Sequence, residues 1–246
     1  MATYQDQNLA QKYLDFLNSQ NGQIQQKVLL GAISSRLPKN RELRVLDAAC
    51  GPGWLSGELK KVYDVVAACD ASEFFIQFSQ SHYPGINFKF TTLDKPLPYQ
   101  NNFFDIVILN MAAPDLNNLA NVFKNLELVL KPSGKLIMTI PNPEFSYPAA
   151  EWKKSLLDVL LGRKPKLITK TPPLSGKKIQ REFGKNVKID SYFYSLADYK
   201  KAAQAAGFTL KFEQEIKSAT DSQEFNLTYQ LYRYPLFLLL EFAKEP

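Results

Sequence analysis

The chain has little of what metal centres and covalent cross-links are built from. Its 246 residues include one histidine, His82, and two cysteines, Cys50 and Cys69. A single histidine without clustered cysteines or acids argues against a metal site. No secretory signal accompanies the cysteines, so we expect reduced thiols in a cytoplasmic protein. A chain of this length buries roughly 70–75% of its unfolded surface, so it needs no such cross-link.

Long apolar runs are also missing. The longest strongly apolar run, residues 235–240, is far shorter than the roughly 20 residues that span a bilayer. Residues 1–11 are polar and glutamine-rich, unlike a signal peptide. We therefore expect no transmembrane segment, and the length fits a single domain over residues 1–246.

The positive charge is confined to one segment. Residues 151–190 contain 11 Lys/Arg and four acids, a net charge of +7, whereas the remainder, with 19 Lys/Arg and 20 acids, carries −1. One internal segment therefore accounts for the whole excess of +6.

The most informative stretch is residues 43–53, which reads L-R-V-L-D-A-A-C-G-P-G. A short apolar run ends at Asp47 and is followed by small residues, with Gly51 and Gly53 before a predicted helix at 54–63. Strand, glycine loop and helix form a cradle for a nucleotide at the carboxyl end of a parallel sheet. An acid at the strand end repels a pyrophosphate but attracts the cationic amino group of S-adenosylmethionine.

This stretch resembles the first motif of the class I (Rossmann-like) S-adenosylmethionine-dependent methyltransferases of the small-molecule type, acid-x-Gly-x-Gly-x-Gly. Asp47, Gly51 and Gly53 match it, and Ala49 replaces the first glycine while still allowing close approach. The resemblance implies an α/β fold: a seven-stranded, mostly parallel sheet with an antiparallel final strand, helices on both faces and a helical or loop cap insertion. It also implies S-adenosyl-L-methionine as cofactor, with S-adenosyl-L-homocysteine as product.

A second strand, residues 64–70, also ends on an acid. Asp70 follows Asp47 by 23 positions, close to the spacing of about 20 at which a carboxylate meets ribose hydroxyls in such folds. We expect Asp70, with the adjacent Ala71, to bind the ribose. The alternative is that Asp70 caps the following helix, residues 71–81, together with Ser72.

Residues 94–105 resemble a second family motif, in which Leu-Pro-aromatic and Phe-Asp lead into strand four. Strand three is expected at 86–91. The resemblance places Leu93 on the adenine face and lets Asp94 accept from its exocyclic amine; the alternative is that Asp94 is a solvated turn acid. Asn110, at the end of strand four (104–110), is a further expected cofactor contact.

Helices are predicted at residues 4–18 and 23–36, where an N-terminal cover (1–36) brings Tyr4 or Tyr13 over the cofactor; the alternative is that both tyrosines pack the helix against the sheet. The core is expected at 37–141 and 189–246, with a basic cap insertion at 142–188. Further helices are predicted at 116–130 (N-cap Asp115), 149–161 and 196–206, and further strands at 135–140, 208–216 and 225–242, with Pro235 at a bulge or edge.

The basic segment is the main indication of the methyl acceptor. It favours a small acceptor bearing a carboxylate or phosphate; peripheral contact with anionic lipid to reach an amphiphilic acceptor, an RNA backbone, and a merely solvated lid remain alternatives. Residues 110–113 lack the Asn/Asp-Pro-Pro-aromatic motif of base-amine methyltransferases, and neither cysteine matches the pyrimidine C5 enzymes.

A different class, a nucleotide-dependent oxidoreductase, rests on the loose match of Gly51, Gly53 and Ser56 to a dinucleotide loop, against which Asp47 speaks. No residue is singled out as a catalytic base, because His82 is expected at the amino edge of the sheet, away from the cofactor. The sequence indicates neither the atom methylated nor the oligomeric state.

Overall fold

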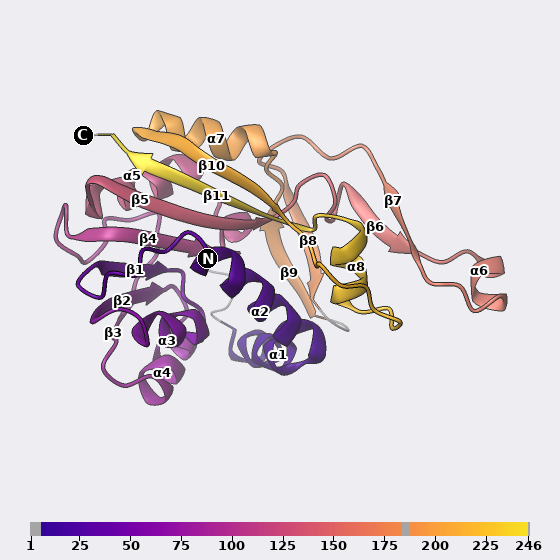
Figure 1. Cartoon of the computed structure of the whole chain (residues 1–246). Coiled ribbons are helices and arrows are strands. Elements are labelled where there is room, and N and C mark those ends of the chain that lie inside the picture. The colour runs from indigo at the N-terminus through magenta and orange to yellow at the C-terminus, as the bar shows by residue number, and fades with distance from the viewer. Residues whose placement is uncertain (1–5, 184–186, 246) are drawn as a thin grey trace.

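The computed structural model describes residues 6–183 and 187–245 and is built around a seven-stranded sheet (Figure 1). The strand order is β10-β11-β5-β4-β1-β2-β3. All neighbouring pairs are parallel except those of β11, which runs antiparallel to both β10 and β5. The strands are β1 (Arg44–Ala48), β2 (Val65–Asp70), β3 (Asn87–Phe90), β4 (Phe104–Asn110), β5 (Leu130–Pro141), β10 (Phe208–Ile216) and β11 (Phe237–Lys244).

Alternating side chains of the central strands feed two cores on opposite faces of the sheet. In β4, Val107 belongs to one core and Ile106 to the other, which is the period of two expected of a strand buried on both sides. The first core includes side chains of α5 (Leu119–Val129) and α7 (Leu196–Ala205). The second includes side chains of α2 (Gln20–Ser34), α3 (Trp54–Lys60) and α8 (Leu227–Arg233).

Two further helices complete the region around the carboxyl ends of β1 and β2. These are α1 (Gln7–Asn18) and α4 (Glu73–His82), which pack on each other through Ala10, Leu14 and Phe75. Within the described residues, no helix has both the length and the apolar composition needed to cross a membrane. The predicted fold class is confirmed.

The last predicted strand, residues 225–242, is wrong in its first half. Residues 227–233 form the helix α8, which Asn226 caps by accepting from the backbone N–H of Tyr229. Pro235 lies between α8 and β11 rather than at a bulge or an edge. β11 itself is an interior strand, and the register shift lies in β10, between Leu210 and Phe212.

The helix predicted at residues 116–130 starts later. α5 begins after Asn118, whose side chain accepts from the N–H of Asn121, so Asn118 and not Asp115 is the N-cap. Asp115 ends a short 3-10 helix, Ala113–Asp115, where its carboxylate is used in a different contact described below.

The helix predicted at residues 149–161 is wrong in its first half. The chain there forms a strand, β6 (Ala150–Lys153), then α6 (Leu156–Leu160), and returns as β7 (Lys166–Thr169). A second hairpin of β8 (Lys178–Phe183) and β9 (Val187–Tyr192) follows. The insertion is therefore two β-hairpins, and Figure 1 shows the first one projecting away from the sheet with α6 at its end.

Candidate functional site

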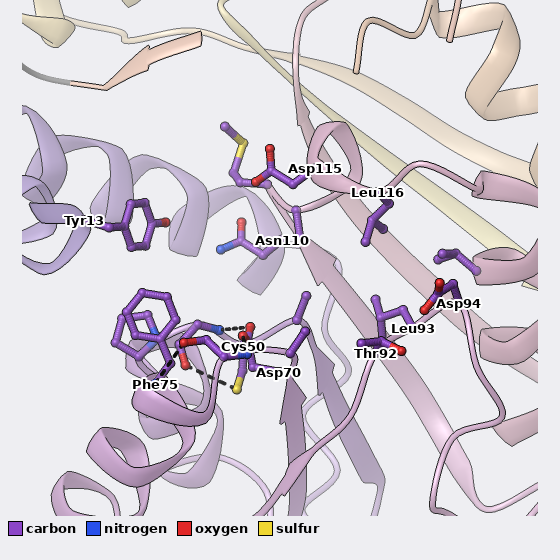
Figure 2. A pocket seen from close by; sticks show the side chains of 18 of the residues that line it. Tyr13, Cys50, Asp70, Phe75, Thr92, Leu93, Asp94, Asn110, Asp115 and Leu116 are labelled. Atoms are coloured by element: carbon purple, nitrogen blue, oxygen red, sulfur yellow. Dashed lines mark hydrogen bonds between the residues drawn. The ribbon is translucent and has the colours of Figure 1, made fainter. Parts of the chain in front are cut away.

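A cavity of about 890 Å³ opens at the carboxyl ends of β1, β2 and β4. Its size is within the range of about 300–1,000 Å³ typical of ligand pockets. The glycine loop after β1, the start of α4 and the segment after β3 form its floor and one wall, and α1, α2 and the β8–β9 hairpin contribute the remainder. Figure 2 shows side chains of α1, the glycine loop, the end of β2, α4, the segment after β3 and the end of β4 around one space.

Asp47 lies at this cavity and is 1% exposed. Ser56 of α3 donates a hydrogen bond from its hydroxyl to Oδ2 of Asp47 at 2.6 Å. Burial raises the pKa of Asp47 to about 7, against the opposing effect of the Ser56 hydrogen bond, and the nearby Asp70 raises it further. The hydrogen bonding from Ser56 offsets only part of the cost of burying this negative charge, so the site favours binding of a cation.

The loop after β1 turns through left-handed backbone. Ala49 has φ +57°, Gly51 has φ +53° and Gly53 has φ +79°. Ala49 and Gly51 line the cavity, whereas Gly53 lies behind it, where a Cβ would come within 2.8 Å of Oγ of Ser79 in α4. Gly53 thus allows the loop to pack on α4, and Ala49 takes a conformation that costs an alanine about 1 kcal/mol or more.

Asp70 ends β2 and ties the glycine loop to α4. Its Oδ2 accepts from the N–H of Gly51 at 2.8 Å, and its Oδ1 accepts from the N–H of Ser72 at 2.8 Å. The side-chain cap of α4 is Ser72, which accepts from the N–H of Phe75. Asp70 and Ala71 both line the cavity, and a carboxylate has about four acceptor positions, more than the backbone N–H groups of the chain occupy here. Burial raises the pKa of Asp70 to about 6.

The segment after β3 supplies the wall that carries Thr92, Leu93 and Asp94, all lining the cavity (Figure 2). Leu93 is 4% exposed and Asp94 is exposed. Thr92 was not predicted: its hydroxyl oxygen is buried and has no hydrogen-bond partner among the residues that the structure describes. A buried hydroxyl without a partner is costly, so it marks a place where a polar ligand atom is expected.

Tyr13 of α1 covers the glycine loop. Its Cε1 is 4.0 Å from the position that a Cβ on Gly51 would take, and its ring lies 5.9 Å from that of Phe75. Burial, together with the negative charges of Asp115 and Asp70, raises the pKa of Tyr13 well above its usual value, so the phenol stays protonated. Tyr4 lies outside the described residues.

Asn110 and Met111 line the cavity at the end of β4. The Asn110 Oδ1 accepts from the hydroxyl of Thr139 in β5 at 2.6 Å, which fixes its amide. Met111 has φ +61°, a strained conformation for a long side chain of the kind that concentrates at functional sites. His82, by contrast, is exposed and stacks on Phe78 outside the cavity-lining residues.

The β8–β9 hairpin is clasped to the loop after β4. Arg181 donates from Nη2 to Oδ1 of Asp115 at 2.7 Å, and the two side chains are only 12% and 17% exposed. Ser191 accepts from Nε of Arg181 and donates to the same Asp115 oxygen, each at 2.8 Å. The clasp brings Lys178 and Lys188 to the cavity.

Known proteins resemble this chain in sequence and in fold. Residues 46–138 match a family model described as a methyltransferase domain. A malonyl-[acyl-carrier protein] O-methyltransferase of Hahella chejuensis is 31% identical over 96 residues, covering 38% of this chain and 34% of that protein. A demethylmenaquinone methyltransferase of Leptospira interrogans is 27% identical over 139 residues, covering 52% and 55%.

Among solved structures, an S-adenosylmethionine-dependent methyltransferase from Mesorhizobium loti superposes with a TM-score of 0.70 at 21% identity, covering 88% of this chain and 97% of that one. The chain spans about a third to a half of the length of the two curated relatives above.

The chain therefore has the fold of the class I, Rossmann-like S-adenosylmethionine-dependent methyltransferases. Its segment 46–138, which contains Asp47, the glycine loop and Asp70, matches the methyltransferase-domain model. The family resemblance inferred from the sequence is confirmed. Among the described residues there is no group of three or more histidines, cysteines or acids able to hold a metal ion.

Proposed function

We propose that this chain transfers a methyl group from S-adenosyl-L-methionine to a small acceptor that bears a carboxylate. One observation carries the proposal: Asp47 and Asp70, at the ends of the neighbouring strands β1 and β2, both open on the cavity above a glycine loop. A buried and a partly buried carboxylate are expensive to leave without a ligand, and a cationic aminoacyl nucleoside supplies both the charge and the hydroxyl groups they lack.

The residues present fit such a ligand. Asp47 is suited to the ammonium group, and the remaining acceptor positions of Asp70 to the ribose hydroxyls. The buried face of Leu93, the unsatisfied hydroxyl of Thr92 and the carboxylate of Asp94 suit an adenine. Tyr13 excludes water from above. When bound, the cofactor supplies a methyl group on a positively charged sulfur, which an acceptor lone pair displaces in line.

The acceptor side of the cavity is formed by the β8–β9 hairpin. Lys178 and Lys188 line it, and Lys178 is balanced by Asp190 at 2.8 Å. An acceptor carboxylate would bind between the lysines already ionised, so no proton has to be removed during transfer. A catalytic base is therefore not required, which agrees with the position of His82 outside the cavity. The O-methyltransferase named above acts on a malonyl group, which carries such a carboxylate.

The alternatives receive less support. The buried Asp47 opposes a dinucleotide pyrophosphate, and Lys153, Lys170 and Arg181 of the basic segment are bound to acids of the chain rather than free for an RNA backbone.

Cys50 and Cys69 are both unpaired, which is consistent with a protein of the reducing cytoplasm. We place the protein there as part of the proposal.

The test is a transfer assay with S-adenosylmethionine carrying an isotopically labelled methyl group. Candidate acceptors are a malonyl thioester, a phosphate monoester, a hydroquinone and transfer RNA. We expect base-labile methyl ester on the carboxylate. Lys178→Ala combined with Lys188→Ala should raise the acceptor KM at least tenfold, whereas Lys177→Ala, an exposed neighbour that does not line the cavity, should leave it unchanged. Label in RNA alone would contradict the proposal.

A further inference from the structure

The first hairpin of the insertion ends in an apolar tip. The helix α6 lies between β6 and β7 at the far end of the projection seen in Figure 1. Leu156 and Leu160 are 79% and 74% exposed. Other large apolar side chains of the tip are also exposed: Leu157, Val159 and Leu161. An exposed apolar group of this density on a protruding element marks an interaction site.

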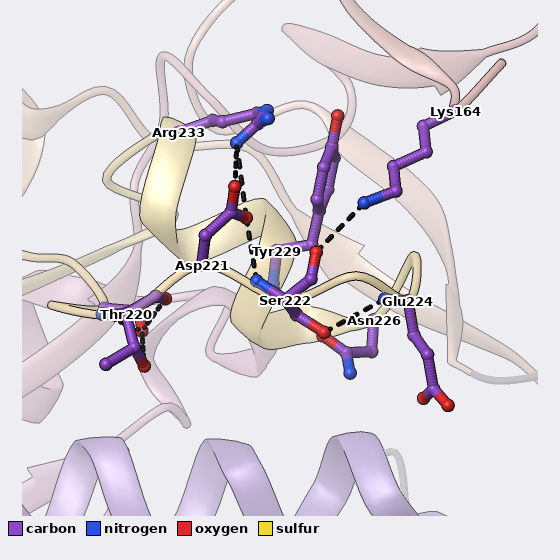
Figure 3. A network of polar contacts seen from close by, with 9 residues as sticks. Lys164, Thr220, Asp221, Ser222, Glu224, Asn226, Tyr229 and Arg233 are labelled. Carbon is purple, nitrogen blue, oxygen red and sulfur yellow. Dashed lines mark hydrogen bonds and ion pairs between the residues drawn. The ribbon is translucent and has the colours of Figure 1, made fainter.

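The tip is presented on a fixed base. Trp152 of β6 packs its ring against Phe225 at 5.3 Å and Tyr234 at 5.7 Å. On the return strand side, Lys164 donates to the carbonyl of Ser222 at 2.9 Å and lies over the ring of Tyr229 (Figure 3). The hairpin is therefore anchored at its root, while the large apolar side chains at its end are each more than half exposed.

Cations surround the root of the tip. Lys153 and Lys154 precede α6, and Arg163, Lys164 and Lys166 follow it, so that positive charge flanks the leucines on both chain segments. Lys154 and Arg163 are exposed and make no salt bridge to a described residue. Within α6 itself the one acid, Asp158, is 6% exposed and turned inward to Ser155 as a capping box.

We propose that this tip, residues 156–161, inserts into the interface of an anionic lipid bilayer, with Lys154 and Arg163 on the lipid phosphates. Apolar side chains of interfacial elements bury roughly 5–10 Å into the boundary between headgroups and acyl chains, a depth within reach of exposed leucines on a protruding tip. The apolar side chains are exposed along nearly the whole helix. A lipid bilayer can surround the tip and cover all of them, whereas a protein partner would cover only one face. Cations beside buried apolar groups add attraction to anionic lipid.

The hairpin follows β5, whose carboxyl end lies at the same edge of the sheet as the cavity. A tip in the membrane would therefore hold the cavity near the lipid surface. This step rests on the proposed function, and it favours an acceptor whose carboxylate is carried on an apolar chain held at that surface.

The test is flotation of the full chain with vesicles of phosphatidylcholine alone or with 30% phosphatidylglycerol. We expect binding to the anionic vesicles only. The double variant Leu156→Ser, Leu160→Ser and the double variant Lys154→Glu, Arg163→Glu should each lower the bound fraction at least tenfold. Both change only exposed side chains, so the core is left intact. Leu174→Ser removes an equally exposed leucine (85%) outside the tip and should bind as the wild type does.

Equal binding by the tip variants and the wild type, or no binding of the wild type, would overturn the proposal. A self-associated wild type that becomes monomeric in the leucine variant, without vesicle binding, would also overturn it and assign the tip to a second copy. Binding of S-adenosylhomocysteine, measured on the same samples, should be equal in all variants, so a failed membrane result is distinguishable from a failed methyltransferase assignment.

Discussion

At the scale of single residues, the site contains side chains and backbone angles that lower the stability of the folded chain. Asp47 is a buried acid with one hydroxyl donor, Thr92 has a hydroxyl without a partner, and Ala49 and Met111 take left-handed backbone. Each feature opposes stability by itself, and all four residues line one cavity. Strained backbone and buried titratable groups of this kind are concentrated at binding and catalytic sites.

The raised pKa of Asp47 makes stability depend on pH. The folded value of about 7 lies above the ordinary value of 3.8, so the folded chain holds the proton more tightly than the unfolded chain in that interval. The free energy of unfolding of the ligand-free chain should therefore fall as pH rises from 5.5 to 7.5, by about 2 kcal/mol from Asp47 alone. Asp70, with its pKa of about 6, adds a smaller fall in the same direction.

Thermal melts across that range test this, with a decrease in Tm of several degrees expected. Asp47→Asn should flatten the profile because the amide does not titrate. Asp64→Asn changes an exposed acid just before β2 and should leave the pH dependence of the Tm unchanged. A melting temperature independent of pH in the wild type would mean that Asp47 is ionised without cost in the folded chain.

At the scale of elements, local sequence predicted the core well and the insertion poorly. Asp47, Asp70 and Asn110 were found because each ends an apolar run whose burial pattern is local. The leucines of residues 149–161 have helical spacing, yet residues 150–153 pair with residues 166–169 across the hairpin. That pairing, like the Arg181–Asp115 clasp, joins residues distant in sequence, which no local pattern encodes. Thr92 carries no signal at all: only the packing around its hydroxyl reveals it.

The clasp should control how the β8–β9 hairpin sits over the cavity. Arg181→Ala leaves the carboxylate of Asp115, 17% exposed, without its charged partner, at a cost of about 2 kcal/mol. We expect faster amide exchange in β9 and a roughly tenfold higher acceptor KM, with the affinity for S-adenosylhomocysteine little changed.

Adding Asp115→Asn to Arg181→Ala should recover part of the protection, because it removes the unpaired charge. Lys211→Ala breaks an exposed ion pair with Glu245 and serves as the control, since such pairs contribute little. Unchanged exchange in β9 of the Arg181 variant would show that other contacts hold the hairpin.

At the scale of the whole molecule, the cavity and the insertion lie at one edge of the sheet, the carboxyl edge of the parallel strands. The glycine loop, the two acids and the segment after β3 line one side of the cavity, which we propose for the cofactor, and the β8–β9 hairpin lines the side proposed for the acceptor. The β6–β7 hairpin extends outward from the same edge with its apolar tip. In the proposal, one edge thus combines cofactor binding, acceptor binding and the membrane contact.

The account depends most on the claim that Asp47 and Asp70 hold the cofactor. Titration calorimetry with S-adenosylhomocysteine at pH 7.5 tests it directly, using the wild type, Asp47→Asn, Asp70→Ala and the control Asp64→Asn, with folding checked by circular dichroism. We expect micromolar affinity in the wild type and control, and a loss of about 100-fold or more in each cavity variant, since a charged hydrogen bond is lost in a buried site. Wild-type affinity in Asp47→Asn and Asp70→Ala, or no binding by the wild type, would contradict the account.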